Sequence, residues 1–183
     1  QPKPEWRARL AEIRDGGFKV CFNQGINIRM IDDESAEAIA SVPYYDDGFT
    51  VRRLYTAWDN IGDEKRFFDG IATLERAGIP PRNVMAYMLI GYDKRETWER
   101  VFSRFNKMVT LGIRPYPMVF DPIRGQRRLP LGGCNQRIDH RTLSEFQRWV
   151  IRKAYTFVSF EDYDVNAKAR PDRRKDELPY VTI

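Results

Sequence analysis

Short apolar runs alternate along the chain with longer amphipathic stretches. The apolar runs cover residues 19–23, 51–58, 84–90 and 115–120 and are rich in β-branched or aromatic side chains, as buried strands are. An amphipathic stretch with apolar residues at helical spacing follows each of the first three runs, and another precedes the first. The strand ends recur about every 30–35 residues, the usual size of a βα unit. The pattern predicts an α/β protein with about four βα units.

Capping signals support the helices of this pattern. The acidic residues 32–34 open the helix after the first strand, where negative charge interacts favourably with the helix dipole. Gly78 and Pro80 end the next helix. Thr142 and Glu145 have the spacing of a capping box and open a C-terminal helix. The apolar stripe of that helix consists of Phe146, Trp149 and Val150.

Repeated βα units form a parallel sheet with right-handed crossovers. Polar residues or glycine follow every predicted strand, and in TIM-type barrels the carboxyl ends of the strands are where sites are built. This favours a barrel over a doubly wound sheet. Because four strands cannot close an eight-stranded barrel, we expect a partial TIM-type (β/α) barrel, or a fragment of one, over residues 1–123.

The net charge of +5 is concentrated in one segment. Residues 1–123 carry 18 Lys and Arg against 18 Asp and Glu, whereas residues 124–153 carry eight against two. We therefore expect residues 124–165 to form a basic loop and a C-terminal helix that packs on the barrel. Residues 166–183 are polar and charged over most of their length, and a mobile tail is expected there.

Composition excludes several classes of protein. The chain has 183 residues, 42% of them hydrophobic, which excludes a wholly disordered chain. No apolar run is long enough to span a bilayer, and no leader opens the chain, so a soluble, cytoplasmic protein without a membrane partner is expected. Cys21 and Cys134 are too far apart for a CxxC site. The single histidine, His140, excludes a His-based triad or a multi-His metal site, so no metal ligands are assigned.

Polar residues at two strand ends form the strongest candidate site. Asn23 and Gln24 follow the first predicted strand, and Asp59 and Asn60 follow the second. Carboxylate and amide groups can accept hydrogen bonds from ligand hydroxyls. An alternative explanation for Asp59 and Asn60 is that they cap the helix that follows.

Four segments in order resemble the later strands of radical S-adenosylmethionine (SAM) enzymes. They are FNQGINIR at residues 22–29, RLYTAWDN at 53–60, YMLIGY at 87–92 and GIRPYPM at 112–118, and the likeness covers roughly residues 17–163. The resemblance implies a six-stranded partial barrel of which these are the third to sixth strands. The family's first strand ends in a CxxxCxxC loop that holds a [4Fe–4S] cluster, and this sequence contains no such motif.

The resemblance therefore implies that this chain is the C-terminal portion of an iron–sulfur oxidoreductase-like enzyme of unknown substrate. SAM and the cluster are expected in the intact parent, whereas the chain alone is expected to bind neither well and to be inactive. By position, Asn23 and Gln24 would face the pocket beneath SAM. Asp59 would accept hydrogen bonds from the ribose hydroxyls, with Asn60 beside it.

The same resemblance assigns residues to the adenine end of SAM. Gly91 takes the place of the second glycine in the family's GxIxGxxE pattern, in which backbone groups and an apolar shelf hold adenine. Tyr116 and Met118 of the sixth strand would complete the apolar side. The other places of the pattern are filled by Tyr87, Leu89 and Lys94, and the first and last of these depart from it.

Two other functions fit the sequence. The basic segment from Arg124 to Lys153, with aromatic residues beside it, is typical of nucleic-acid binding or of a solvated basic loop. A βα protein that binds a phosphorylated metabolite is the other alternative. The open edge of a partial barrel also predicts a homo-oligomer in which that edge is covered.

Overall fold

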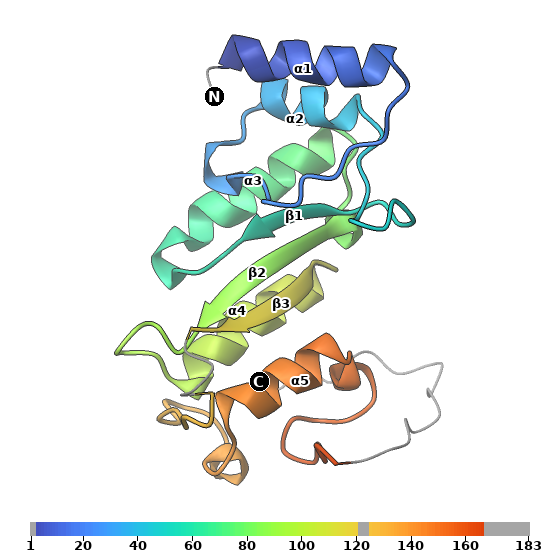
Figure 1. Ribbon diagram of the computed structural model, residues 1–183. Coiled ribbons are helices and arrows are strands. Elements are labelled where there is room, and N and C mark those ends of the chain that lie inside the picture. Colours follow the sequence, from blue (N-terminus) through green and yellow to red (C-terminus); the bar gives the residue numbers. More distant parts are fainter. Residues whose placement is uncertain (1–2, 121–124, 167–183) are drawn as a thin grey trace. The chain divides into compact units, whose positions relative to one another are not determined.

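The computed structural model describes residues 3–120 and 125–166 (Figure 1). It is a mixed α/β structure with a three-stranded parallel sheet. The expected tail, apart from Asn166, and the first residue of the basic segment, Arg124, lie outside the described residues.

The sheet has the sequential strand order β1-β2-β3, as predicted. Strand β1 spans Leu54–Ala57, β2 spans Val84–Ile90 and β3 spans Arg114–Val119. Strands β1 and β2 are parallel, with Leu54 opposite Val84. Alternate residues of β2, from Val84 to Ile90, are fully buried on one face, which explains why this run is so uniformly apolar.

The first of the four predicted strands, residues 19–23, is not a strand in the structure. It forms a single parallel bridge, between Val20 and Tyr44, and the chain then turns, with the Gly25 N–H donating to the Phe22 carbonyl at 2.8 Å. The turn leaves too few extended residues for a ladder. The segment nevertheless runs beside β1, because the Ile26 N–H donates to the Tyr55 carbonyl at 2.8 Å.

Five α-helices lie within the described residues: α1 (Lys3–Asp15), α2 (Asp33–Ala40), α3 (Glu64–Arg76), α4 (Trp98–Thr110) and α5 (Leu143–Ile151). The predicted capping box of α5 is confirmed, and the Asp32 side chain caps α2 by accepting from the Ser35 N–H at 2.9 Å. None of the helices in this part of the chain combines the length and the apolar character needed to cross a membrane.

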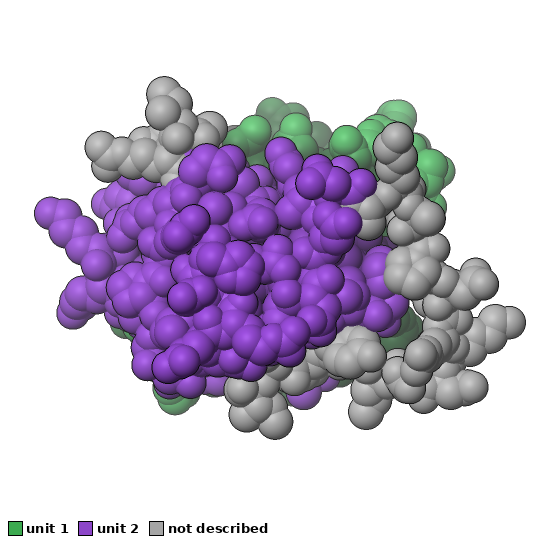
Figure 2. Space-filling view, turned by 90° about the horizontal axis from the view of Figure 1, so that it is seen from below, with its two compact units in different colours: residues 1–87, 111–114 green, residues 88–110, 115–183 purple. Residues whose placement is uncertain are grey.

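The chain divides into two compact units (Figure 2). Unit 1 comprises residues 1–87 and 111–114, and unit 2 comprises residues 88–110 and 115–183. The boundaries of the units fall within strands, since β2 and β3 each continue from one unit into the other. In unit 1, α1 packs on α2, and α2 packs on α3.

An aromatic cluster forms the core of unit 2. The rings of α4 interlock with those of α5 in edge-to-face and tilted contacts, such as Phe102 with Phe146 at 5.5 Å and Phe105 with Trp149 at 5.1 Å between centroids. Phe160 adds a ring from the segment after α5. Burying this many large rings supplies much of the hydrophobic stabilisation of the unit.

Phe146→Ala should therefore destabilise the protein strongly. The Phe146 ring is fully buried and contacts five other rings of the cluster. Its removal should lower the free energy of unfolding by about 3–5 kcal/mol in a denaturant titration. Phe120→Ala is the control, since that ring is 54% exposed, and it should change stability by about 1 kcal/mol or less. Equal losses in the two variants would contradict the assignment of the core.

Candidate functional site

A cleft of about 430 Å³ lies in unit 1 at the carboxyl end of β1. One wall is residues 24–29, and the other is residues 57–60, with Asp63 and Phe67 completing the lining. The cleft therefore gathers three of the predicted site residues, Gln24, Asp59 and Asn60. Carboxyl ends of parallel strands are where sites form in βα proteins, so the position agrees with the expectation from the sequence.

Hydrogen bonds to β1 hold the first wall. The Ile26 N–H donates to the Tyr55 carbonyl, and the Thr56 hydroxyl donates to the Ile26 carbonyl at 3.1 Å. Residues Ile28–Met30 then form a short 3-10 helix, η1. These contacts fix residues 24–30 against the strand end instead of leaving them as a free loop.

Gly70 of α3 lets η1 approach closely. A Cβ atom at Gly70 would lie 2.2 Å from the Ile28 carbonyl oxygen, a distance that no real contact allows. The Ile28 side chain is itself buried. The absence of a side chain at Gly70 is therefore what allows η1, and with it the first wall of the cleft, to pack on α3.

The second wall separates the roles of Asp59 and Asn60. Asn60 caps the short 3-10 helix Ile61–Asp63, η2, because its side-chain oxygen accepts the Gly62 N–H at 2.9 Å. The Asn60 carbonyl also accepts the Trp58 indole N–H at 2.9 Å. Asp59 is exposed and lines the cleft. The Asn60 side chain thus caps η2, and Asp59 belongs to the lining of the cleft.

Aromatic and amide side chains both contribute to the lining of the cleft. Trp58 is 1% exposed and stacks on the fully buried Phe67, with 5.1 Å between ring centroids. Gln24 and Asn27 bring amide groups to the same lining. Aromatic walls with a few polar groups are typical of small-molecule sites, and the volume falls in their usual range of roughly 300–1,000 Å³.

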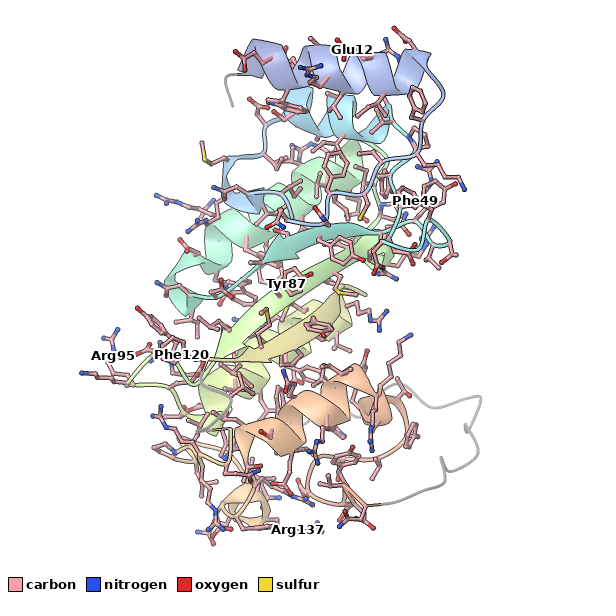
Figure 3. All side chains as sticks on the ribbon, in the orientation of Figure 1. Glu12, Phe49, Tyr87, Arg95, Phe120 and Arg137 are labelled. Carbon is pink, nitrogen blue, oxygen red and sulfur yellow. The ribbon has the colours of Figure 1, made fainter. Side chains whose placement is uncertain are left out.

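The remaining predicted site residues lie elsewhere in the two units. Asn23 is exposed and directly precedes the cleft wall in unit 1. Gly91, Tyr116 and Met118 belong to unit 2. Tyr116 is half-buried and Met118 is 46% exposed on β3. Tyr87, which is labelled in Figure 3, stands at the first place of the GxIxGxxE pattern and belongs to unit 1. Its ring stacks on that of Tyr55.

Sequence reasoning missed Glu96. Its carboxylate accepts the Gly91 N–H and pairs with Arg104, which also donates to the Leu89 carbonyl at 3.1 Å. Arg127 donates to the Gly91 carbonyl at 3.0 Å. This chain has Lys94 at the place where the GxIxGxxE pattern has a glutamate. An acidic residue, Glu96, stands two residues later, and its carboxylate is bonded to the N–H of Gly91. The only signal in the sequence was an acidic residue close after the strand end.

Gly91 itself could not be replaced by another residue without strain. Its φ of +84° lies in the left-handed region, and a Cβ atom would lie 2.7 Å from a methyl carbon of Leu143. Both of its backbone polar groups are bonded to side chains of unit 2. The strand end at Gly91 is therefore fixed from within the protein.

The residues present do not fit a [4Fe–4S] cluster. Such a cluster needs three cysteine thiolates close together, and this chain has two cysteines in all. Burial raises the pKa of both thiols, the opposite of the shift that metal ligation requires. Within residues 3–120 and 125–166 no group of three or more His, Cys, Asp or Glu side chains is placed to hold a metal ion.

Comparison with known proteins adds no relative. The chain matches no family model, no curated protein and no solved structure.

Gly70→Ala should test how the first wall is built. Alanine is favoured over glycine in a helix by about 1 kcal/mol, so propensity alone predicts stabilisation. The contact with Ile28 predicts instead a loss of about 1–3 kcal/mol in the free energy of unfolding. Ala72→Gly, at an exposed position of the same helix, measures propensity without the contact. A Gly70→Ala protein more stable than the unchanged chain would show that α3 and η1 do not pack in this way.

Glu96→Ala should show how much the buried Glu96–Arg104 ion pair contributes to the free energy of unfolding. The side chains of Arg104 and Glu96 are 2% and 6% exposed, so the variant removes a buried carboxylate that pairs with a buried guanidinium. The free energy of unfolding should fall by about 3–5 kcal/mol in urea. Asp69→Ala removes the exposed partner of Lys65 and should cost less than about 1 kcal/mol. Similar losses in both variants would refute the structural role assigned to Glu96.

Proposed function

We propose that this chain is the C-terminal portion of a radical SAM enzyme and that its cleft holds the nucleoside part of SAM. The observation that carries the proposal is the convergence of Gln24, Asp59 and Asn60 on one cleft at the carboxyl end of β1. Those residues come from two of the segments that resemble the family. The same proposal includes the finer architecture expected from the sequence, which is a partial barrel with four βα units. It also includes a cytoplasmic location.

Asp59 is the residue that recognises the ribose in this proposal. A carboxylate offers two acceptor oxygens, which suits the two neighbouring hydroxyls of a ribose. Hydrogen bonds to a charged acceptor are stronger than those between neutral groups. Gln24 and Asn27 on the opposite wall can bond the remaining polar atoms of the nucleoside, and the aromatic side chains of the same lining exclude water.

SAM supplies a 5′-deoxyadenosyl group that becomes a hydrogen-abstracting radical when a cluster reduces it. Because the residues of this chain do not fit the cluster, we assign no such step to them. Their part is to bind the nucleoside and to hold its ribose in one orientation. The substrate-specific chemistry belongs to the parent enzyme.

The nucleic-acid alternative is less favoured because several arginines of the basic segment already have partners. Arg127 donates to the Gly91 carbonyl, and Arg137 pairs with Glu161 and Asp162 at 2.8 and 2.6 Å. Arg141 is 9% exposed and donates to the Glu161 carbonyl. Among the described residues of this segment, the exposed arginines are Arg128, Arg137, Arg148 and Arg152.

Two further expectations from the sequence concern a phosphorylated ligand and the oligomeric state. A phosphorylated metabolite is disfavoured because the cleft is lined by two carboxylates, of Asp59 and Asp63, and by one guanidinium, of Arg29. A homo-oligomer remains part of the proposal, since β3 carries the exposed Met118 and is followed by the exposed Phe120.

Asp59→Ala should weaken the binding of adenosine by about tenfold or more, because charge-assisted bonds to the ribose hydroxyls are lost. Isothermal titration calorimetry on the 183-residue chain measures this directly. Asp47→Ala removes an exposed aspartate of the same unit that does not line the cleft, and it should leave the affinity unchanged. An Asp59→Ala protein that binds adenosine as well as the unchanged chain would overturn the proposed function.

A further inference from the structure

An exposed aromatic ring lies on the loop that leads into β1. Phe49, labelled in Figure 3, is 43% exposed, and its φ of 51° lies in the left-handed region. Bulky residues rarely adopt this conformation, because it is sterically strained. The loop is nevertheless fixed, since the Asp46 carboxylate accepts the N–H groups of Thr50 and Val51 at 2.8 and 3.2 Å. The loop thus holds an apolar ring in solvent, where it adds little to the core of unit 1.

Two cations lie beside this loop. The Lys19 Nζ donates to the Phe49 carbonyl at 3.3 Å and lies 4.8 Å from the centre of the Tyr45 ring. The Arg52 guanidinium lies 5.0 Å from the centre of the same ring. Both cationic side chains are exposed. Phe49 is therefore flanked by positive charge.

Three more arginines lie at the amino ends of the strands. Arg53 directly precedes β1, Arg82 lies two residues before β2, and Arg114 is the first residue of β3. All three belong to unit 1, and the strands are neighbours in the order β1-β2-β3. Because neighbouring strands are about 4.8 Å apart, the amino ends of the three strands form a row.

The arginines of this row repel one another. Arg53 is half-buried, and its Nη1 donates to the Arg82 carbonyl at 3.1 Å. Burial and the positive charge of Arg114 lower the pKa of Arg53, whereas Asp46 has a smaller, opposite effect. In the part of the chain that the structure describes, neither Arg82 nor Arg114 forms an ion pair with an acidic side chain. The row is therefore ready to bind an anion, which would relieve the repulsion.

We call this region the amino-end surface, and it consists of Lys19, Phe49, Arg52, Arg53, Arg82 and Arg114. Its five cations exceed the two carboxylates of the adjoining loop, those of Asp46 and Asp47. A guanidinium binds phosphate oxygens in pairs through its planar fork. Cations at three successive strand ends suit a chain of phosphates better than one small anion.

We propose that the amino-end surface binds a single strand of nucleic acid, with phosphates on the arginines and one base stacked on Phe49. Positive charge that follows the backbone, together with an aromatic ring for the bases, is how proteins bind single strands without reading their sequence. An unpaired base is needed to reach the ring, so a duplex should bind more weakly. The exposed apolar side chains of the loop, Phe49 and Val51, offer too little area to anchor a membrane.

The inference does not depend on the proposed function. The amino-end surface lies at the amino end of β1, whereas the cleft lies at its carboxyl end. DNA and RNA share the phosphates and the bases that the surface would bind. Two probes of the same mixed sequence, a DNA and an RNA strand of about 12 nucleotides, therefore serve to test it.

Fluorescence anisotropy with these strands should show binding to the 183-residue chain that weakens as salt is raised from 50 to 200 mM. Arg82→Gln and Arg114→Gln should each weaken binding about threefold or more and reduce the salt slope by about 0.7. The matched controls are Arg148→Gln and Arg152→Gln, which remove exposed arginines of the basic segment in unit 2. They should leave the affinity unchanged.

An abasic strand separates stacking from charge, because it keeps the phosphates and lacks the bases. Phe49→Ala should weaken binding of the normal strands about fivefold or more and that of the abasic strand about twofold or less. Phe49→Trp keeps a ring for stacking and should retain the affinity for the normal strands. Phe120→Ala removes a ring of unit 2 that is 54% exposed and should have no effect.

The stronger binding of the DNA or the RNA strand tells which of the two the surface prefers, and either result supports the inference. Affinity that survives Arg82→Gln and Arg114→Gln would overturn it, as would equal effects of Phe49→Ala on normal and abasic strands. A duplex, a polyglutamate peptide or anionic lipid vesicles that bind as tightly as the single strands would also overturn it. Failure of both strands to bind would overturn the inference and leave adenosine binding at the cleft, and with it the proposed function, untouched.

Discussion

The cleft depends on one close contact between a helix and a short turn of 3-10 helix. Gly70 allows the backbone of Ile28 to lie directly on α3, at a distance that any side chain would prevent. Because residues 24–30 are also hydrogen-bonded to β1, the segment is fixed on both sides. A loop held at two places can present Gln24, Asn27 and Arg29 in defined positions, which a solvent-exposed loop with free torsions could not do.

The two units place their polar strand ends in different environments. At the end of β1, in unit 1, polar groups line a cleft, and Asp59 and Arg29 are accessible to a ligand. At the end of β2, in unit 2, the backbone of Gly91 is already bonded to Glu96 and Arg127, and the buried Glu96–Arg104 pair secures the arrangement. Strand ends that look alike in sequence therefore line a cleft in one unit and are bonded to buried side chains in the other.

Much of this fold could be predicted from the sequence, and the exceptions have physical causes. The uniformly apolar run 84–90 is β2, and the Thr142–Glu145 capping box opens α5, since both signals are local. Residues 19–23 have strand-like composition but no room for a ladder before the turn at Gly25. The structure brings Asp59 and Asn60 together with Gln24 in one cleft lining, and only the structure could show that Asn60 caps η2. Glu96 was missed because its contact with Arg104 is one that only folding brings about.

The most direct test of the account is a crystal structure of the chain with adenosine. The account predicts that the nucleoside occupies the cleft of unit 1, with the ribose hydroxyls within hydrogen-bonding distance of the Asp59 carboxylate and with Trp58 and Phe67 in the lining around it. Adenosine bound away from this cleft, or bound in it with the ribose turned away from Asp59, would contradict the account.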